Sequence, residues 1–125
     1  MRLVDTTVAV DHLRGQSEAT ELLAGLIAAG EPLLASEIVR FELTAGVKDG
    51  ELEDLEAVLS VLSWVPVDAA VSRTAGELAR RYRESHSGIG DADYLIAATA
   101  VVLGADLLTT SVRHFPMIPG LAPAY

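Results

Sequence analysis

The chain alternates short apolar runs with helical segments, and this alternation constrains its fold more than any other feature. Runs of strand length are expected at residues 2–5, 32–35, 64–67 and 106–109, with 117–118 as a candidate fifth. Helical spacing of apolar residues fills the stretches between them. Strands joined by helices favour a parallel sheet with helices on both faces. We therefore predict one domain over residues 1–125, an α/β fold built as a three-layer α/β/α sandwich with a central parallel sheet of four to five short strands.

The helical segments carry the expected start and stop residues. Helices are predicted over 8–14, 18–29, 37–45, 49–62, 70–83 and 91–103, with Ser17, Ser36 and Asp68 as N-caps and glycines after several ends. The segment 49–62 is amphipathic, with leucines and a valine on one face and four acids on the other. The segment 91–103 is almost wholly apolar after Asp93, so we expect it to lie at the centre of the domain.

Charge is distributed unevenly along the chain. Eighteen acids against nine bases give a net charge of −9. Residues 1–62 hold twelve acids and four bases, whereas residues 63–125 hold six acids and five bases. Such a chain suits a basic partner or cations, and it repels nucleic acid at long range. A polyanion would therefore meet mainly the second half.

Cysteine is absent, which excludes disulfides, a thiolate nucleophile and Cys-ligated zinc. This agrees with a reducing cytoplasm, the location that we predict. No run approaches the ~20 apolar residues that span a bilayer, so no membrane association is expected. Asp5 and Asp11 interrupt the apolar stretch at the N-terminus, which therefore does not resemble a signal peptide.

Polar residues follow the expected strands, where ligands bind in open parallel sheets. They are Asp5, Thr6 and Thr7 after the first strand, Ser36 and Glu37 after the second, Asp68 after the third, and Thr110 and Ser111 after the fourth. Asp5 ends an apolar strand, where a carboxylate is costly to bury unless it is paired or metal-bound. An N-cap role for Asp5 explains the position equally well.

Two further acids stand out on the predicted helices. Glu42 adjoins Ile38 and Ala45 at helical spacing, so its carboxylate points toward the core. The alternative for Glu42 is a long-range salt bridge to an arginine. Asp91 and Asp93 share the first turn of the helix 91–103, where one can cap the helix and the other can face a site.

Three carboxylates from separate elements could converge at one cleft. Two such charges 4 Å apart repel by ~4 kcal/mol at an effective dielectric constant of about 20, so they take up protons or hold a cation. An all-oxygen site suits Mg²⁺ or Mn²⁺ and supports metal-assisted phosphodiester hydrolysis. The spacing of the acids does not by itself require them to converge.

Four sequence blocks carry a resemblance that covers nearly the whole chain. They are VDTTVAVDHLRG near the N-terminus, SEIVRFELTAG at 36–46, IGDADYLIAATAVVLGADLLTT at 89–110 and SVRHFPMIPGL at 111–121. With these blocks in this order, the chain resembles the PIN-domain nucleases, and specifically the VapC-type toxins of bacterial toxin–antitoxin pairs. The resemblance implies an α/β/α sandwich and a ribonuclease site that uses Mg²⁺ or Mn²⁺.

The resemblance also assigns roles to individual residues. Asp5, Glu42 in ELTAG and Asp93 in DYLIAA match the three catalytic, metal-binding acids of the family. Accessory roles are implied for Asp91, Thr6, Thr7 and Ser111. Ser111 stands where the family usually has Asp or Asn, which puts a second metal site in doubt.

The resemblance also bears on the residues after Ser111 and on the function and partners of the protein. Arg113 is expected to contact RNA phosphate, whereas His114 is more often structural or solvated in such a position. The expected function is that of a toxin that cleaves tRNA or rRNA, is neutralised by a VapB-type antitoxin and forms a homodimer. The alternative is a catalytically weakened PIN-like interaction module. A dehalogenase-type phosphatase fits poorly, because Asp5-Thr6-Thr7 lacks the second acid of its D-x-D motif.

Overall fold

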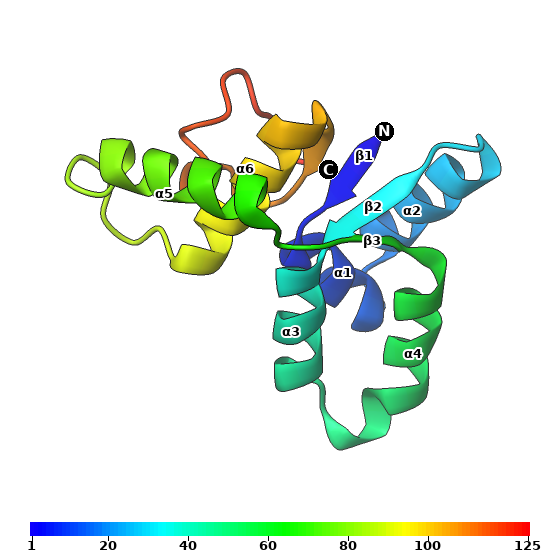
Figure 1. Ribbon diagram of the computed structural model, residues 1–125. Helices are drawn as coiled ribbons and strands as arrows, with labels where there is room; N and C mark the ends of the chain where they lie inside the picture. The colour runs from blue at the N-terminus through cyan, green and yellow to red at the C-terminus, as the bar shows by residue number, and fades with distance from the viewer.

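A computed structural model, which describes all 125 residues, contains six α-helices, two 3₁₀ segments and one four-stranded sheet (Figure 1). The elements are β1 (Arg2–Val4), α1 (Thr6–Leu13), α2 (Ser17–Ala28), β2 (Leu33–Ser36), α3 (Glu37–Gly46), η1 (Asp49–Glu51), α4 (Leu52–Val61), β3 (Ser63–Val65), α5 (Ala69–Tyr82), α6 (Asp91–Leu103), β4 (Asp106–Leu108) and η2 (Val112–His114). The predicted α/β architecture with a central parallel sheet is confirmed.

The strands lie in the order β3-β2-β1-β4, and every neighbouring pair is parallel. The chain moves outward from β1 to β2 and β3, and then crosses back to add β4 on the other side of β1. The strand order therefore reverses between β1 and β4. In the register of this pair, Val4 lies opposite Leu108. Ligands of open parallel sheets bind outside the strand ends at such a reversal.

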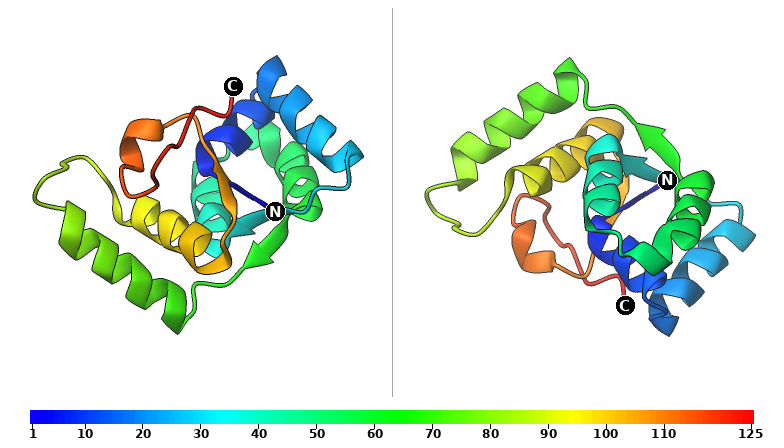
Figure 2. Two further views of the ribbon diagram at one scale, coloured as in Figure 1. Left: turned by 90° about the horizontal axis from the view of Figure 1, so that it is seen from above. Right: turned by 90° about the horizontal axis from the view of Figure 1, so that it is seen from below.

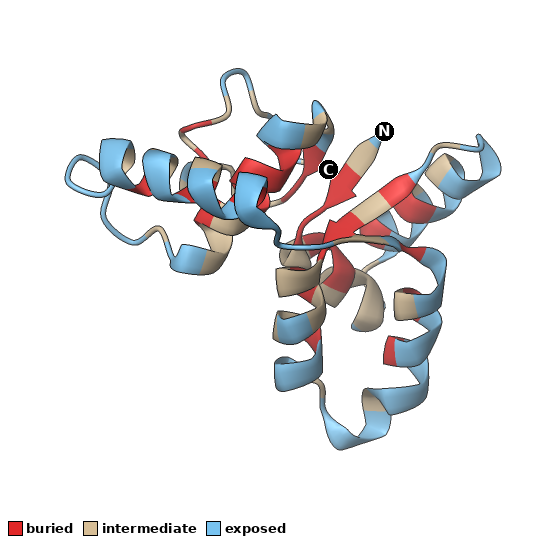
Figure 3. Cartoon of the chain, viewed as in Figure 1, coloured by how far each residue is buried: buried red, intermediate tan, exposed pale blue.

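Helices cover the sheet on two sides. Both views of Figure 2 show α5 and α6 on one side of the strands, and α1, α2 and α4 on the other. Helix α3 descends from the end of β2 and contacts both α1 and α6 (Figure 1). The sheet and the inner helix faces form one core of 24 buried apolar residues (Figure 3). As expected, α6 is the most deeply buried helix. No helix combines the length and apolarity needed to cross a membrane.

Several local predictions need correction. Met117 and Ile118 form a turn rather than a fifth strand, with the Ile118 amide bonded to the Phe115 carbonyl. Pro116 and Pro119 flank these two residues and have no N–H group to donate to a sheet. At the other end of the chain, α1 begins at Thr6 rather than at position 8, because Asp5 caps it.

Other boundaries also differ from expectation, and β3 spans Ser63–Val65 rather than 64–67. Gln16, not Ser17, caps α2, since its side-chain oxygen accepts from the Ala19 amide. β4 ends at Leu108, one residue earlier than predicted. The predicted helix 49–62 is divided into η1 and α4. The predicted caps Ser36 and Asp68 are confirmed, because each side chain accepts a hydrogen bond from the first turn of its helix.

Two tyrosines differ in how their hydroxyls are satisfied. Tyr94 is 2% exposed, and its hydroxyl is the only buried side-chain polar atom without a hydrogen-bond partner. The Tyr125 hydroxyl donates to Asp11 Oδ2 at 2.6 Å. Burial, followed by this bond to Asp11, raises the pKa of the Tyr125 phenol above its ordinary value. Removal of the hydroxyl is therefore expected to change the free energy of unfolding in opposite directions at the two positions.

We expect Tyr94→Phe to leave the free energy of unfolding unchanged or to raise it by up to ~1 kcal/mol, because it removes an unsatisfied buried group. Tyr125→Phe should lower it by about 1 kcal/mol, because it breaks a hydrogen bond to a carboxylate. Urea unfolding followed by circular dichroism measures both. A larger loss for Tyr94→Phe than for Tyr125→Phe would show that a buried water satisfies the Tyr94 hydroxyl.

Candidate active site

Asp5 lies at the point where the strand order reverses. It follows β1 directly, and its backbone amide donates to the Leu108 carbonyl of β4 at 2.9 Å. This bond continues the β1–β4 ladder by one residue, so Asp5 comes beside Thr109. Asp5 is 3% exposed and is the only charged residue of the chain that is buried. A carboxylate this buried requires hydrogen-bond partners.

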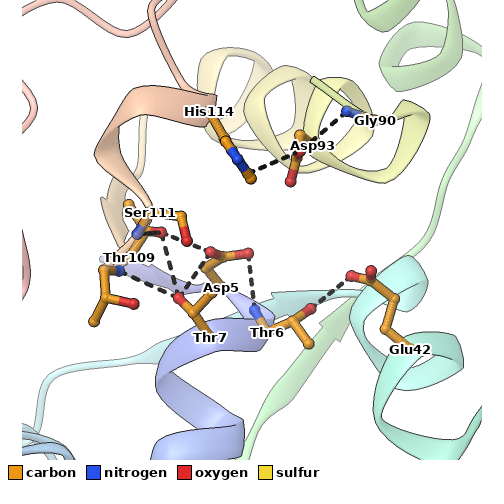
Figure 4. Close-up of polar contacts among 10 residues, drawn as sticks. Asp5, Thr6, Thr7, Glu42, Gly90, Asp93, Thr109, Ser111 and His114 are labelled. Atoms are coloured by element: carbon orange, nitrogen blue, oxygen red, sulfur yellow. Dashed lines mark hydrogen bonds and ion pairs between the residues drawn. The ribbon is translucent and has the colours of Figure 1, made fainter. Parts of the chain in front are cut away.

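The carboxylate of Asp5 has three such partners (Figure 4). Its Oδ1 accepts from the Thr6 amide at 2.8 Å, which caps α1. Its Oδ2 accepts from two hydroxyls, that of Thr7 at 3.0 Å and that of Thr109 at 2.6 Å. Thr6 and Thr7 therefore hold the Asp5 carboxylate in place through these bonds. The two explanations offered for Asp5, helix capping and a place in a site, are compatible.

Glu42 reaches the same region from α3. Its Oε1 accepts from the Thr6 hydroxyl at 2.7 Å. Thr6 thus links two acids, through its amide to Asp5 and through its hydroxyl to Glu42. Glu42 is half-buried and forms no salt bridge, so the arginine partner considered as an alternative does not exist. In Figure 4 its side chain lies across Thr6 from Asp5.

Asp93 faces Asp5 from the first turn of α6 (Figure 4). Its Oδ2 accepts from the Gly90 amide at 3.2 Å and lies 3.4 Å from Nδ1 of His114. Burial raises the pKa of the Asp93 carboxyl above its ordinary value. The Gly90 amide and His114 act in the opposite direction, and the charge of Asp5 raises the pKa further.

The remaining predicted residues occupy different surroundings. Asp91 points to solvent with its side chain 89% exposed, and its Oδ1 lies 3.2 Å from Arg83 Nη2. It lies two residues from Asp93, about 200° around the helix, so the two carboxylates diverge. The half-buried Ser111 donates its amide to the Thr109 hydroxyl at 3.0 Å. Arg113 is exposed on η2, next to His114.

The structure thus brings Asp5, Glu42 and Asp93 to one end of the sheet, but it does not bring them into direct contact. No three acidic or histidine side chains are close enough together to enclose a metal ion by themselves. The donor chemistry nevertheless fits a hard cation, because every candidate ligand is a carboxylate oxygen. Mg²⁺ keeps several waters and is held through one or two carboxylates, so a closed three-acid cage is not required.

Two residues beside these acids were not assigned a role from the sequence. Thr109 was missed because β4 was predicted one residue too long, which placed this threonine inside the strand. The predicted strand end at 109 makes Thr110 and Ser111 the strand-end residues instead. His114 was expected to be structural or solvated, yet its imidazole lies against Asp93. The HF pair in SVRHF was the available signal for His114, since Phe115 is 1% exposed and anchors that turn in the core.

Comparison with known proteins identifies the family of the chain. A family model for the PIN domain matches residues 2–119. The chain belongs to the PIN-domain family. Within the family it is of the VapC type, since ribonuclease VapC19 of Mycobacterium tuberculosis is 62% identical over 125 residues, all of both chains. Ribonuclease VapC10 of the same species is 40% identical, over all of this chain and 93% of the relative.

Solved structures of other proteins share the fold. VapBC2 from Rickettsia felis, bound to a DNA fragment from its promoter, matches with a TM-score of 0.83 and 26% identity, over 98% of this chain and 96% of that chain. A toxin–antitoxin complex from Klebsiella pneumoniae matches with a TM-score of 0.82 and 24% identity, over 100% and 98%. The resemblance seen in the four sequence blocks is confirmed for family and fold.

The raised pKa of Asp93 leads to a prediction for this VapC-type protein without metal. Folding favours the neutral carboxyl, so at neutral pH the ionised group lowers the stability of the native state. Below the ordinary pKa of 3.8 the carboxyl is protonated in both folded and unfolded chains, and this loss disappears. We therefore expect Asp93→Asn to raise the melting temperature at pH 7 in the presence of EDTA, with a gain that shrinks as the pH falls toward 4.

Thermal unfolding of the two proteins between pH 4 and 8 measures this effect. The exposed Asp91→Asn variant serves as the control, and it should show no comparable gain. A melting temperature of Asp93→Asn that stays below that of the wild type at pH 7 would contradict the expected sign.

Proposed function

We propose that this chain is a Mg²⁺- or Mn²⁺-dependent endoribonuclease that acts as the toxin of a type II toxin–antitoxin module and inhibits translation by hydrolysing cellular RNA. One observation carries the proposal: three carboxylates, from β1, α3 and α6, surround the strand-order reversal in a chain that is 62% identical to a named ribonuclease. The RNA is of the tRNA or rRNA class, and the site of action is the cytoplasm, where these RNAs are found.

The acids have distinct parts in this proposal. Asp5, Asp93 and Glu42 would hold the ion, directly or through its waters. When bound, the ion activates water and stabilises negative charge on the attacked phosphate. The repulsion between Asp5 and Asp93 supports this assignment, because a divalent cation relieves it. Thr6 keeps Glu42 in reach of Asp5 through its two hydrogen bonds.

A protein with a net charge of −9 repels RNA at long range, so RNA binding requires local basic groups. Arg113 is exposed on η2, directly beside the imidazole that contacts Asp93. We assign it to a phosphate of the RNA near the cleaved bond. Ser111 adds no charge at the position where the family usually has Asp or Asn, which favours a site that holds one ion rather than two. Homodimer formation stays a prediction.

The activity test compares Asp93→Asn with Asp91→Asn, two first-turn acids of the same helix. With total tRNA and rRNA as substrate and saturating Mn²⁺, we expect Asp93→Asn to lower the cleavage rate by more than ~100-fold, because even indirect partners of metal ligands cost 10–100-fold. Asp91→Asn should remain within about threefold of the wild type, as surface changes usually do.

Two results would decide against this assignment. Equal losses in both variants would place Asp91 in the site. Intact RNA with the wild-type protein at saturating Mn²⁺ would favour the alternative, an interaction module whose activity was weakened by the change to Ser111.

An apolar groove on the first half of the chain suits the antitoxin. A cavity of about 260 Å³ lies among α1, α2, α4 and the sheet, and ten of its twelve lining residues are hydrophobic. Ile27 and Val61 line it and are 50% and 55% exposed, respectively. The exposed face of α4 carries Glu53, Asp54 and Glu56. We propose that a basic, amphipathic segment of a VapB-type antitoxin binds here, with its apolar face in the groove.

Two equally exposed valines test this groove. Val61 lines it at the end of α4, whereas Val101 lies on α6, outside the groove, and is 54% exposed. Val61→Glu should weaken binding of the co-expressed antitoxin by at least ~10-fold, about 1.4 kcal/mol, because it places a charge on an apolar contact. Val101→Glu should bind the antitoxin with the affinity of the wild type. Calorimetry of each variant with the antitoxin gives the affinities, and equal affinities would show that the antitoxin binds elsewhere.

A further inference from the structure

Residues 124 and 125 tie together two segments that are far apart in the sequence. The Ala124 amide donates to the Thr109 carbonyl at 2.9 Å, and the Tyr125 hydroxyl donates to Asp11 Oδ2 at 2.6 Å. Thr109 follows β4, whereas Asp11 lies in α1. Both views of Figure 2 show this end of the chain beside α1. These two neighbouring residues therefore form a bridge from the end of β4 to α1.

The two bridged segments are also the ones that hold the buried carboxylate of the site. The Thr6 amide and the Thr7 hydroxyl of α1 donate to Asp5. The Thr109 hydroxyl donates to the same carboxylate. In addition, the Thr110 amide donates to the Thr7 hydroxyl at 3.2 Å. All of these bonds fasten the first turn of α1 to the segment after β4.

The bond from Tyr125 fastens α1 at a second point. Asp11 lies six residues beyond Asp5, which is about 9 Å along the helix axis. A helix held at one end can pivot about that end, whereas a second fixed point sets its direction. Val8 and Ala9 bury α1 against the core, but apolar contacts are non-directional. The hydrogen bonds at the two points therefore determine the angle between α1 and the end of β4 more closely than the core contacts do.

The contact between Tyr125 and Asp11 is well supported. Leu121, Ala124 and Tyr125 are half-buried and pack against the hydrophobic core, which seats this end of the chain. Hydrogen bonds to a carboxylate are stronger than those between neutral groups. The Asp11 carboxylate has no other hydrogen-bond donor and forms no ion pair. Removal of the phenol hydroxyl therefore releases this point of α1 completely.

We propose that Tyr125 is a positioning residue of the metal site and that it acts through α1. By fixing the direction of the helix, its hydroxyl keeps Thr6 and Thr7 where they bond the acids Asp5 and Glu42. Such precision matters, because a misplacement of about 1 Å caused by a distant change can cost roughly 100-fold in rate. The inference rests on the proposed function, since it concerns how the same site is held ready for its ion.

The test measures Mn²⁺ binding separately from catalysis and from stability. Tyr125→Phe keeps the packing of the ring and removes the donor, and Asp11→Ala removes the acceptor. Asp68→Ala is the matched control, because it removes the N-cap bond to the Val71 amide of α5 and so lowers stability without touching α1. Well below the melting temperatures, electron paramagnetic resonance of free Mn²⁺ gives the affinity. Cleavage of total tRNA and rRNA gives the Mn²⁺ concentration for half-maximal rate.

We expect Tyr125→Phe and Asp11→Ala each to weaken Mn²⁺ binding by roughly tenfold and to raise the half-maximal Mn²⁺ concentration in parallel. The double variant should lose no more than either single variant, because the two side chains form one contact. Asp11→Asn, whose amide oxygen still accepts from the phenol, and Asp68→Ala should stay within about threefold of the wild type.

Two kinds of result would count against these claims, and they differ. Wild-type Mn²⁺ affinity in Tyr125→Phe, or an equal loss of affinity in Asp68→Ala, overturns the inference and leaves Tyr125 with a structural role alone. Tyr125→Phe decides the question by itself if Asp11→Ala does not fold. A wild-type protein that neither binds Mn²⁺ nor cleaves RNA overturns the proposed function instead.

Discussion

The parallel pairing of β1 with β4 is the constraint on which the site depends. It continues one residue past the strands, through the bond from the Asp5 amide to the Leu108 carbonyl. That bond places a buried carboxylate beside a buried hydroxyl that is 104 positions away along the chain. Since β4 can pair with β1 only after the chain has crossed back over the sheet, the site is complete only when the whole domain has folded.

The same arrangement places the negative charges of Asp5 and Asp93 at one end of the sheet. Asp5 is almost wholly buried, and its charge disfavours ionisation of Asp93 across the site. Three hydrogen bonds stabilise Asp5 as a carboxylate, whereas Asp93 has the Gly90 amide and a histidine. The ionised Asp93 carboxylate therefore lowers the stability of the native state at neutral pH, and the cation proposed for this site would relieve that cost. The apolar core of the rest of the domain offsets this loss of stability, and its central helix, α6, is almost entirely apolar.

Most of the fold could be predicted from the sequence, because periodicity and capping residues are local signals. The strands, the helices and the caps Ser36 and Asp68 all follow from neighbours within a few residues. Contacts across the sheet were not predictable in this way. Thr109 was missed because its role depends on the register between β1 and β4, and a boundary error of one residue hid it. Asp91 and Asp93 looked alike in the sequence, but they lie about 200° apart around α6, so Asp93 faces Asp5 while Asp91 is exposed beside Arg83.

Helix α1 connects the two surfaces on which the proposed function depends. Its first turn holds Thr6 and Thr7 of the site, and Ala9 and His12, one to two turns further on, line the apolar groove. At 1.5 Å per residue, the groove therefore begins roughly 5 Å along the helix from the site. Val4, which precedes Asp5 directly, also lines the groove. A basic segment that extends from a partner seated there has only a short distance to cover before it reaches the acids. The excess of acids in residues 1–62 would favour such a basic segment, whereas an RNA substrate would meet less repulsion over the nearly neutral second half.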